Sequence, residues 1–165
     1  MRFVNLSVCE LQQNKSNQAK VLLDSVMQLA NYPKQRSFIY LIYGQYYAQE
    51  GNLSLAKSSI EKAKALFNEN DNMTRIADCN FFLGDIQMEE GNYGAAEKFY
   101  KSYLVYHEAQ NNVEQKFGGY YALSQLYSKR HDFKLAFEYA NKCVYIQDTL
   151  HTEKKLKERK SQEIL

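Results

Sequence analysis

The three histidines, His107, His131 and His151, are the residues of this 165-residue sequence best suited to metal binding or acid–base catalysis. They fall in different parts of the chain, and no Glu or Cys stands at ligand spacing on the same helix face. Adjacent acids such as Glu89 and Glu90 point in different directions on a helix and do not form an acid–base pair. No glycine-rich loop followed by Lys and Ser or Thr is present to hold a phosphate. The sequence therefore predicts a protein that is not an enzyme and has no metal or cofactor.

Three cysteines, Cys9, Cys79 and Cys143, are the other residues with reactive side chains. They are widely separated along the chain, and an odd number at such distances fits neither a disulfide framework nor a pair of thiolate metal ligands. We therefore predict that they are small apolar core residues rather than redox groups. Three such thiols suit a reducing compartment.

The charge balance limits the possible partners. The chain has 21 Lys and Arg residues against 19 Asp and Glu residues, for a formal charge of +2. Mixed charges without a broad basic surface argue against non-specific binding of nucleic acid. The longest uninterrupted apolar run, residues 38–43, has six residues, far fewer than the roughly 20 that a membrane-spanning helix needs. We expect no nucleic-acid binding and no membrane insertion by this segment.

Tyrosine is unusually frequent, with 14 residues against nine phenylalanines. Tyr40, Tyr43 and Tyr47 lie three and four residues apart, and no Lys or Arg stands between them. A surface that stacks nucleic-acid bases needs basic residues on the same face. We therefore predict that most tyrosines pack between helices, with the hydroxyl reaching solvent.

The elements that carry these residues are predicted to be helices arranged in a repeat. Apolar residues recur at steps of three and four, and only one Pro and seven Gly interrupt them. The pair Gly44 and Gly51 returns further along the chain, at the same separation, as Gly84 and Gly91, which indicates an internal repeat. The same register aligns one alanine in each of four copies of the unit: Ala19, Ala56, Ala96 and Ala136.

Each copy is predicted to form an antiparallel pair of helices. A small residue in the first helix, Gly44 or Gly84 in the middle copies, lets the second helix approach closely. Gly51 and Gly91 supply the left-handed backbone that ends the first helix. The polar residue after the turn, which is Asn52, Asn92 or Asp132, accepts hydrogen bonds from the free amides that open the second helix.

These residues resemble the pattern of the tetratricopeptide repeat (TPR) family over nearly the whole chain. The resemblance implies an all-α fold, a right-handed α-α superhelix of about four helix hairpins with an extended C-terminal helix. The 40-residue spacing resembles the longer-helix version of the repeat. Asn80, where the family has an aromatic residue, and Gln87, where it has Tyr, depart from the pattern and put the packing of that hairpin in question.

We expect a repeat domain at 1–150, in units of about 1–34, 35–73, 74–112 and 113–150, and a charged C-terminal cap or connector at 151–165. The expected helices are 2–13, 16–31, 36–50, 53–68, 74–90, 93–109, 113–130 and 133 to about 160.

The first helix of every unit is expected to line a concave surface that binds a protein or an extended peptide. Leu41, Phe81 and Tyr121 hold equivalent positions in three units, and a solvated helix face would not normally repeat a large apolar residue there. The predicted lining is Val4, Val8, Leu41, Gln45, Gln49, Phe81, Asp85, Met88, Glu89, Tyr121, Gln125 and Lys129.

The polar residues of this lining indicate the chemistry of the partner. Gln45, Asp85 and Gln125 share one repeat position and have side chains that bond a peptide backbone. Family members that capture the acidic tails of heat-shock chaperones use Lys, Arg and Asn at such positions, and this sequence does not match that clamp. An apolar segment, or one that is neutral to basic near Asp85 and Glu89, fits better.

The C-terminal stretch admits two interpretations. Residues 153–165 contain five Lys or Arg, three Glu and three scattered apolar residues, which is typical of a solvated capping helix. The stretch from Tyr139 to the end also resembles the repeat segment of bacterial membrane-anchored regulators with a kinase or helix-turn-helix output domain. If Ile146, Leu150, Leu156 and Leu165 form an intermolecular seam, the helix instead makes a homodimer.

The sequence thus predicts a non-catalytic binding scaffold, the sensory or interaction module of a bacterial signalling or transcriptional regulator. The alternative is a self-association module that acts through the C-terminal helix. Residues 1–10 lack the features of a secretory signal, so we expect a cytoplasmic protein if the chain is complete. A fragment of a membrane-anchored regulator would instead lie on the periplasmic side.

Overall fold

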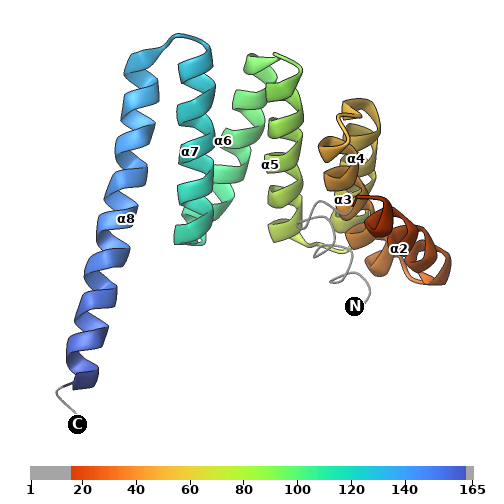
Figure 1. The fold of residues 1–165 in the computed structure, drawn as a ribbon, viewed down its shortest axis with the longest axis horizontal. Coiled ribbons are helices and arrows are strands. Elements are labelled where there is room, and N and C mark those ends of the chain that lie inside the picture. The colour runs from red at the N-terminus through yellow and green to blue at the C-terminus, as the bar shows by residue number, and fades with distance from the viewer. Residues whose placement is uncertain (1–15, 163–165) are drawn as a thin grey trace. The chain divides into compact units, whose positions relative to one another are not determined.

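The computed structural model describes residues 16–162, all of whose regular elements are helices (Figure 1). The predicted helix 2–13, with Val4, Val8 and Cys9, lies outside the described residues. The helices are α2 (Ser16–Leu29), α3 (Pro33–Gln49), α4 (Leu53–Glu69), α5 (Met73–Glu89), α6 (Tyr93–Ala109), α7 (Val113–Lys129) and α8 (Phe133–Gln162).

The helices follow one another at a constant interval. Those from α3 to α8 begin at positions 33, 53, 73, 93, 113 and 133. Helices α3 to α7 are each 17 residues long. The predicted 40-residue unit therefore consists of two halves of equal length. Every expected helix within the described residues is present, with ends that differ by up to three residues.

The turns between these helices share one backbone conformation. Gly51 and Gly91 have φ of 73° and 76°, as their predicted role in ending a helix requires. Asp71, Asn111 and His131 adopt the same left-handed region at φ of 52°, 52° and 59°. All five turns therefore reverse the chain in the same way, including the two between repeats, where the sequence pattern has no glycine.

Side-chain caps open several of the helices. Asn52 Oδ1 accepts from the Leu55 amide at 3.1 Å, and Asp132 Oδ1 accepts from the Leu135 amide at 3.2 Å. Both caps were predicted from their positions after the turn. Asn92 instead donates its side-chain amide to Glu90 Oε2 at 3.2 Å.

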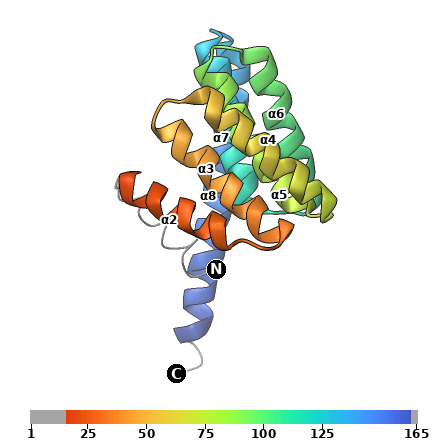
Figure 2. The same cartoon turned by 90° about the vertical axis from the view of Figure 1, so that its right-hand side faces the viewer.

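The chain divides into two compact units, residues 1–99 and 100–165, which are described separately. In the first unit, α3 and α4 form a tight hairpin (Figure 2). A Cβ added at Gly44 would overlap Ile60 Cδ1 and lie 3.3 Å from the Ala56 carbonyl oxygen. Only a residue without a side chain fits there, which confirms the predicted role of Gly44.

The core of this unit is built from the positions that the repeat register aligned. Ala56, Ile60, Ala63 and Phe67 of α4 pack with Leu83 of α5 in one buried cluster. Ala19 of α2 is buried in a second cluster, where several tyrosines of α3 also pack. The prediction that tyrosines serve the helix core is confirmed for Tyr43 and Tyr46 of α3 and for Tyr100, Tyr103 and Tyr127 elsewhere.

The second unit contains the end of α6 and the α7–α8 hairpin. Gly119 of α7 lies against α6, because an added Cβ would be 2.5 Å from Leu104 Cδ2 and 3.1 Å from Tyr103 Cδ1. Its neighbour Gly118 has no atom within 4 Å of the same position. Helix α8 runs without a break from Phe133 past the expected boundary at 150/151 to Gln162.

Candidate partner-binding surface

The predicted lining residues of the first unit come from α3 and α5, two first helices that contact each other. On α3, Gln45 is half-buried and Gln49 is exposed. On α5, Phe81 and Asp85 are half-buried and Glu89 is exposed. Two amides of α3 and two carboxylates of α5 are therefore at least partly accessible, as is the aromatic side chain of Phe81.

Two predicted lining residues do not belong to an open surface. Leu41 is 6% exposed and packs in the core cluster with Ile60 and Leu83. Met88 is 9% exposed. Apolar residues at these positions are covered by their neighbours, so we correct the prediction and remove both from the exposed lining.

The third set of predicted residues lies on α7, in the second unit. Tyr121 is 55% exposed and stacks on Phe117, with ring centroids 6.5 Å apart and an angle of 7° between the rings. Gln125 and Lys129 are exposed. Tyr121 is therefore the most accessible of the three equivalent large apolar residues.

Acidic side chains gather along the same side of α5. Asp78, Asp85 and Glu89 lie seven and four residues apart, which places them on one face of the helix. Arg75 Nη1 forms an ion pair with Asp78 Oδ2 at 2.9 Å on the helix's first turns. Asp85 and Glu89 continue this acidic side of α5 toward the end of the helix.

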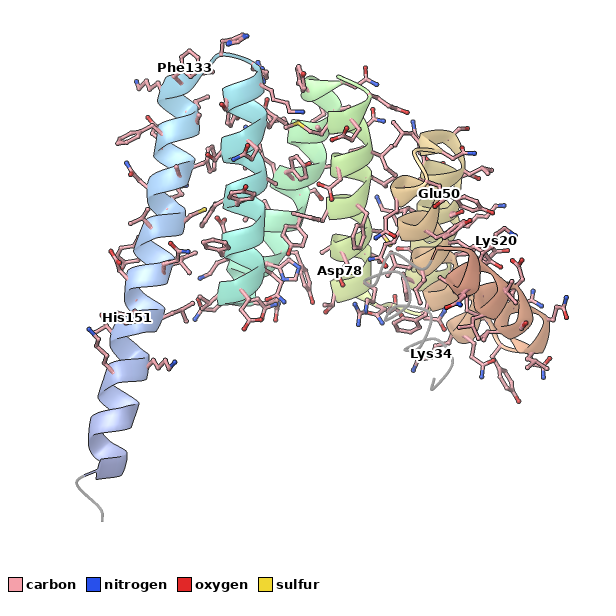
Figure 3. All side chains as sticks on the ribbon, in the orientation of Figure 1. Lys20, Lys34, Glu50, Asp78, Phe133 and His151 are labelled. Carbon is pink, nitrogen blue, oxygen red and sulfur yellow. The ribbon has the colours of Figure 1, made fainter. Side chains whose placement is uncertain are left out.

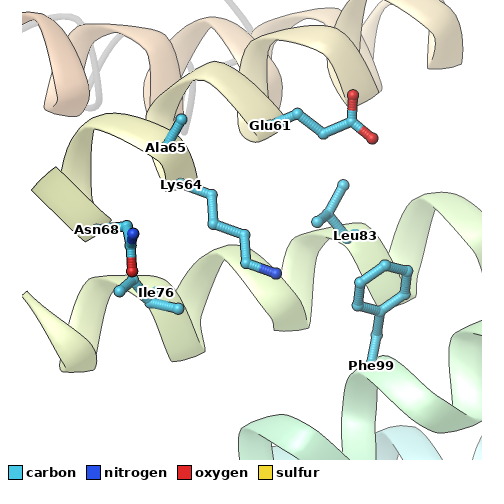
Figure 4. A pocket seen from close by; sticks show the side chains of 7 residues that line it. All are labelled: Glu61, Lys64, Ala65, Asn68, Ile76, Leu83 and Phe99. Carbon is cyan, nitrogen blue, oxygen red and sulfur yellow. The ribbon is translucent and has the colours of Figure 1, made fainter.

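A pocket of about 390 Å³ in the first unit was not predicted (Figure 4). It lies between α4, α5 and the start of α6, and Lys64 extends across it from α4 toward α5. Its lining residues are Glu61, Lys64, Ala65, Asn68, Ile76, Leu83 and Phe99.

Lys64 explains the first departure from the repeat pattern. Its Nζ donates to Oδ1 of the buried Asn80 at 2.6 Å and lies 5.8 Å from the centre of the Phe99 ring. A buried amide needs a hydrogen-bond partner, and Lys64 supplies one from the neighbouring helix. A polar residue at an otherwise aromatic position was the sequence signal that could have pointed to this bond.

Gln87, the second departure, is buried where the family has Tyr. Its Nε2 donates to Glu90 Oε2 at 2.5 Å, and its Oε1 accepts from Asn92 Nδ2 at 3.4 Å. These bonds connect the end of α5 to the turn that follows it. Polar contacts therefore stand at both positions where the family has an aromatic residue.

The cysteines within the described residues are buried and free, as predicted for Cys79 and Cys143. Burial, together with the charge of the neighbouring Asp78, raises the pKa of the Cys79 thiol to about 12. Burial also raises the pKa of Cys143. Both thiols are protonated near neutral pH, a form that neither binds metals nor attacks electrophiles.

Only part of the seam that the sequence suggested for a homodimer is exposed to solvent. Ile146 is buried, whereas Leu150 is partly exposed. The side chains of Leu156 and Leu165 lie outside the described residues. Ile146 belongs to the interior of the second unit and cannot take part in contacts between chains.

Among the side chains that the structure describes, no group of three or more His, Cys, Asp or Glu residues is arranged to hold a metal ion. Residues 16–162 contain no helix that is both long and apolar enough to span a bilayer.

Comparisons with known proteins agree with this architecture. The family model described as tetratricopeptide repeat matches residues 39–70, 77–104 and 118–149, more than half of the chain. Among solved structures, the chain is similar to MamA, with a TM-score of 0.68 and 17% identity over 91% of this chain and 79% of MamA. It is also similar to BtubC (BKLC) from P. vanneervenii, with a TM-score of 0.52 and 14% identity over 88% of this chain and 78% of that one.

No curated protein sequence matches the chain. The structural similarities confirm the predicted all-α fold class, and no enzymatic family is indicated. The repeats found by the family model coincide with the hairpins α3–α4, α5–α6 and α7–α8. The chain belongs to the tetratricopeptide repeat family.

Proposed function

We propose that this chain is a non-catalytic scaffold that binds an extended protein segment across α3 and α5. The TPR fold supports a protein-interaction role in general. The observation that supports the finer proposal is that α3 and α5 contact each other. Gln45 and Gln49 lie on α3, and Phe81, Asp85 and Glu89 lie on α5, none of them fully buried.

The chemistry of these residues defines the segment that fits. Glutamine side chains both donate to and accept from a peptide backbone. The half-buried Phe81 offers an aromatic surface for an apolar side chain. Asp85 and Glu89 favour Lys or Arg in the segment. We therefore propose a peptide that combines an apolar residue with at least one basic residue.

The biological setting is a further proposal. The Lys- and Glu-rich sequence after residue 149 supports a role as the interaction module of a bacterial signalling or transcriptional regulator. In such a module the binding surface would recognise the partner, and α8 would connect it to an output domain.

A peptide-display selection against the immobilised chain tests the binding surface. We expect enriched peptides to contain a basic and an apolar residue, with affinities measurable by fluorescence polarisation. Asp85→Lys should weaken binding at least tenfold by reversing the charge, and Phe81→Ala should weaken it by about 1 kcal/mol or more if Phe81 is an anchor.

Controls separate a lost contact from lost structure. Glu69→Lys makes a charge reversal of the same kind at an exposed position at the end of α4 and should leave the affinity unchanged. Circular dichroism should show native helicity for every variant. Enriched peptides that bind the Asp85→Lys variant as tightly as the wild type would remove the proposed surface.

A further inference from the structure

The outer face of α8 exposes several large apolar side chains. Phe137, Val144 and Tyr145 are 66%, 51% and 74% exposed. Phe133, which Figure 3 labels at the start of the helix, is also exposed. One side of the helix holds residues spaced at steps of four, three, one and three, which keeps them on a single face. These residues are Phe137, Asn141, Val144, Tyr145 and Asp148. We call these residues, with Phe133, the outer face.

The opposite side of α8 is already used inside the second unit. Ala136, Cys143 and Ile146 are buried, and Cys143 Sγ lies 3.7 Å from the Phe117 carbonyl oxygen of α7. The outer face is thus additional to the α7–α8 hairpin contact, and the protein does not need it to close that hairpin.

The repeat register shows what this face does in the other units. Lys64, Leu104 and Val144 hold equivalent positions in three successive units. Lys64 bonds to Asn80 on α5, and Leu104 lies under Gly119 of α7 and is 5% exposed. In α4 and α6 this position therefore contacts the helix that follows. Val144 occupies the same place on α8 and is half exposed, so at this one position the outer face continues a contact that the preceding repeats make with their next helix.

We propose that the outer face binds the same face of a second copy of this chain, with the two α8 helices antiparallel and the two-fold axis near Asn141. The charge arrangement favours this partner. Lys134 and Asp148 are both exposed and lie seven residues on either side of Asn141. Antiparallel pairing places Lys134 of each copy opposite Asp148 of the other, which is electrostatically favourable.

The apolar residues match in the same register. Phe137 and Tyr145 lie four residues on either side of Asn141, so each Phe137 meets a Tyr145 of the other copy. Asn141 faces its own equivalent, and two amides can hydrogen-bond to each other. Lys142 does not interfere, because its Nζ lies 4.9 and 4.8 Å from the ring centres of Tyr120 and Tyr139 within its own unit.

The size of the surface fits a reversible dimer. Taking roughly 200 Å² for a whole aromatic side chain, Phe133, Phe137 and Tyr145 together expose about 400 Å². Two copies would bury about 800 Å² of aromatic surface, and the polar rim would bring the total near the lower limit of stable interfaces, about 1,200 Å². We therefore expect an association that depends on protein concentration.

Sedimentation velocity of the full chain over a range of concentrations tests the proposal. We expect a monomer–dimer equilibrium that Phe137→Glu weakens at least tenfold, because it buries a charge in the contact. The matched control is Val105→Glu, which places the same charge on an exposed valine of α6 and should leave the dimer intact. Both positions are exposed, so native circular dichroism is expected for both variants.

Charge reversal tests the antiparallel register. Lys134→Asp should weaken the dimer, because it places two like charges opposite each other at each end of the contact. The double variant Lys134→Asp/Asp148→Lys should restore it. A chain that stays monomeric at high concentration, or a dimer that Phe137→Glu leaves unchanged, would overturn the proposal. If Phe137→Glu weakens the dimer but the double variant does not restore the dimer lost in Lys134→Asp, the antiparallel pairing is wrong.

Discussion

Substituting Ala at Gly118 and Gly119 should change the stability of the protein in opposite directions. These neighbours lie in the middle of α7, and neither has the positive φ that disfavours a side chain. They differ in their surroundings: Gly118 faces open space, whereas Gly119 lies against Leu104 and Tyr103 of α6. Comparing the two variants therefore measures the packing of α7 against α6, because both substitutions are the same and lie side by side in one helix.

The expected magnitudes follow from these contacts. At Gly118 the new methyl touches nothing within 4 Å, so the higher helix propensity of Ala should stabilise the protein by about 0.5–1 kcal/mol. At Gly119 it would lie 2.5 Å from Leu104 Cδ2 and 2.7 Å from its Cγ. Leu104 is buried and must shift at its branch point, which costs about 1–3 kcal/mol and outweighs the gain in propensity.

Urea unfolding followed by far-ultraviolet circular dichroism measures both effects. We expect the two variants to differ by about 2 kcal/mol in the free energy of unfolding, or by about 4–8 °C in Tm for a chain of this length. Adding Leu104→Ala should remove most of the Gly119→Ala penalty, because the overlapping atoms are gone. Equal stabilisation by both glycine substitutions would refute the close contact between α6 and α7.

Two other predictions concern Cys79 and the turn at His131. Cys79 is buried and its pKa is raised to about 12, so it should resist iodoacetamide in the native protein at mildly alkaline pH and react after unfolding. Peptide mass spectrometry measures the labelling, and rapid labelling of the native protein would contradict the burial of Cys79. His131→Gly should raise the free energy of unfolding by about 1 kcal/mol in the urea assay, because a backbone φ of 59° is less strained for glycine than for histidine. An unchanged free energy of unfolding would mean that contacts of the imidazole compensate for the backbone strain.

The local order of this protein was predictable because its signals lie within single repeat units. Gly51 and Gly91 mark the ends of helices, and the aligned alanines mark where the second helix packs on the first. The left-handed turns at Asp71 and Asn111 were not predicted, because neither residue type indicates a positive φ as strongly as glycine does. Only the folded structure shows that these two turns belong to the same regular series as the glycine turns.

The candidate surface was less predictable than the fold. Leu41 and Tyr121 occupy equivalent positions, yet Leu41 lies in the core and Tyr121 is largely open. Exposure depends on which side chains other helices place nearby, and a repeat register contains no information about them. Asn80 likewise looks like a defect in the pattern until Lys64 of the preceding helix is seen to donate to it.

The sequence alone determined the class of the fold, the length of its units and the places where each helix ends, because apolar periodicity and turn residues act over a few positions of the chain. Tertiary structure decided which apolar residues remain available to a partner. Ile146 and Phe137 look alike as apolar residues of one helix, but only the packing of α7 against α8 buries the first and leaves the second exposed. Burial is a property of neighbouring helices, and their side chains come together only when the chain folds.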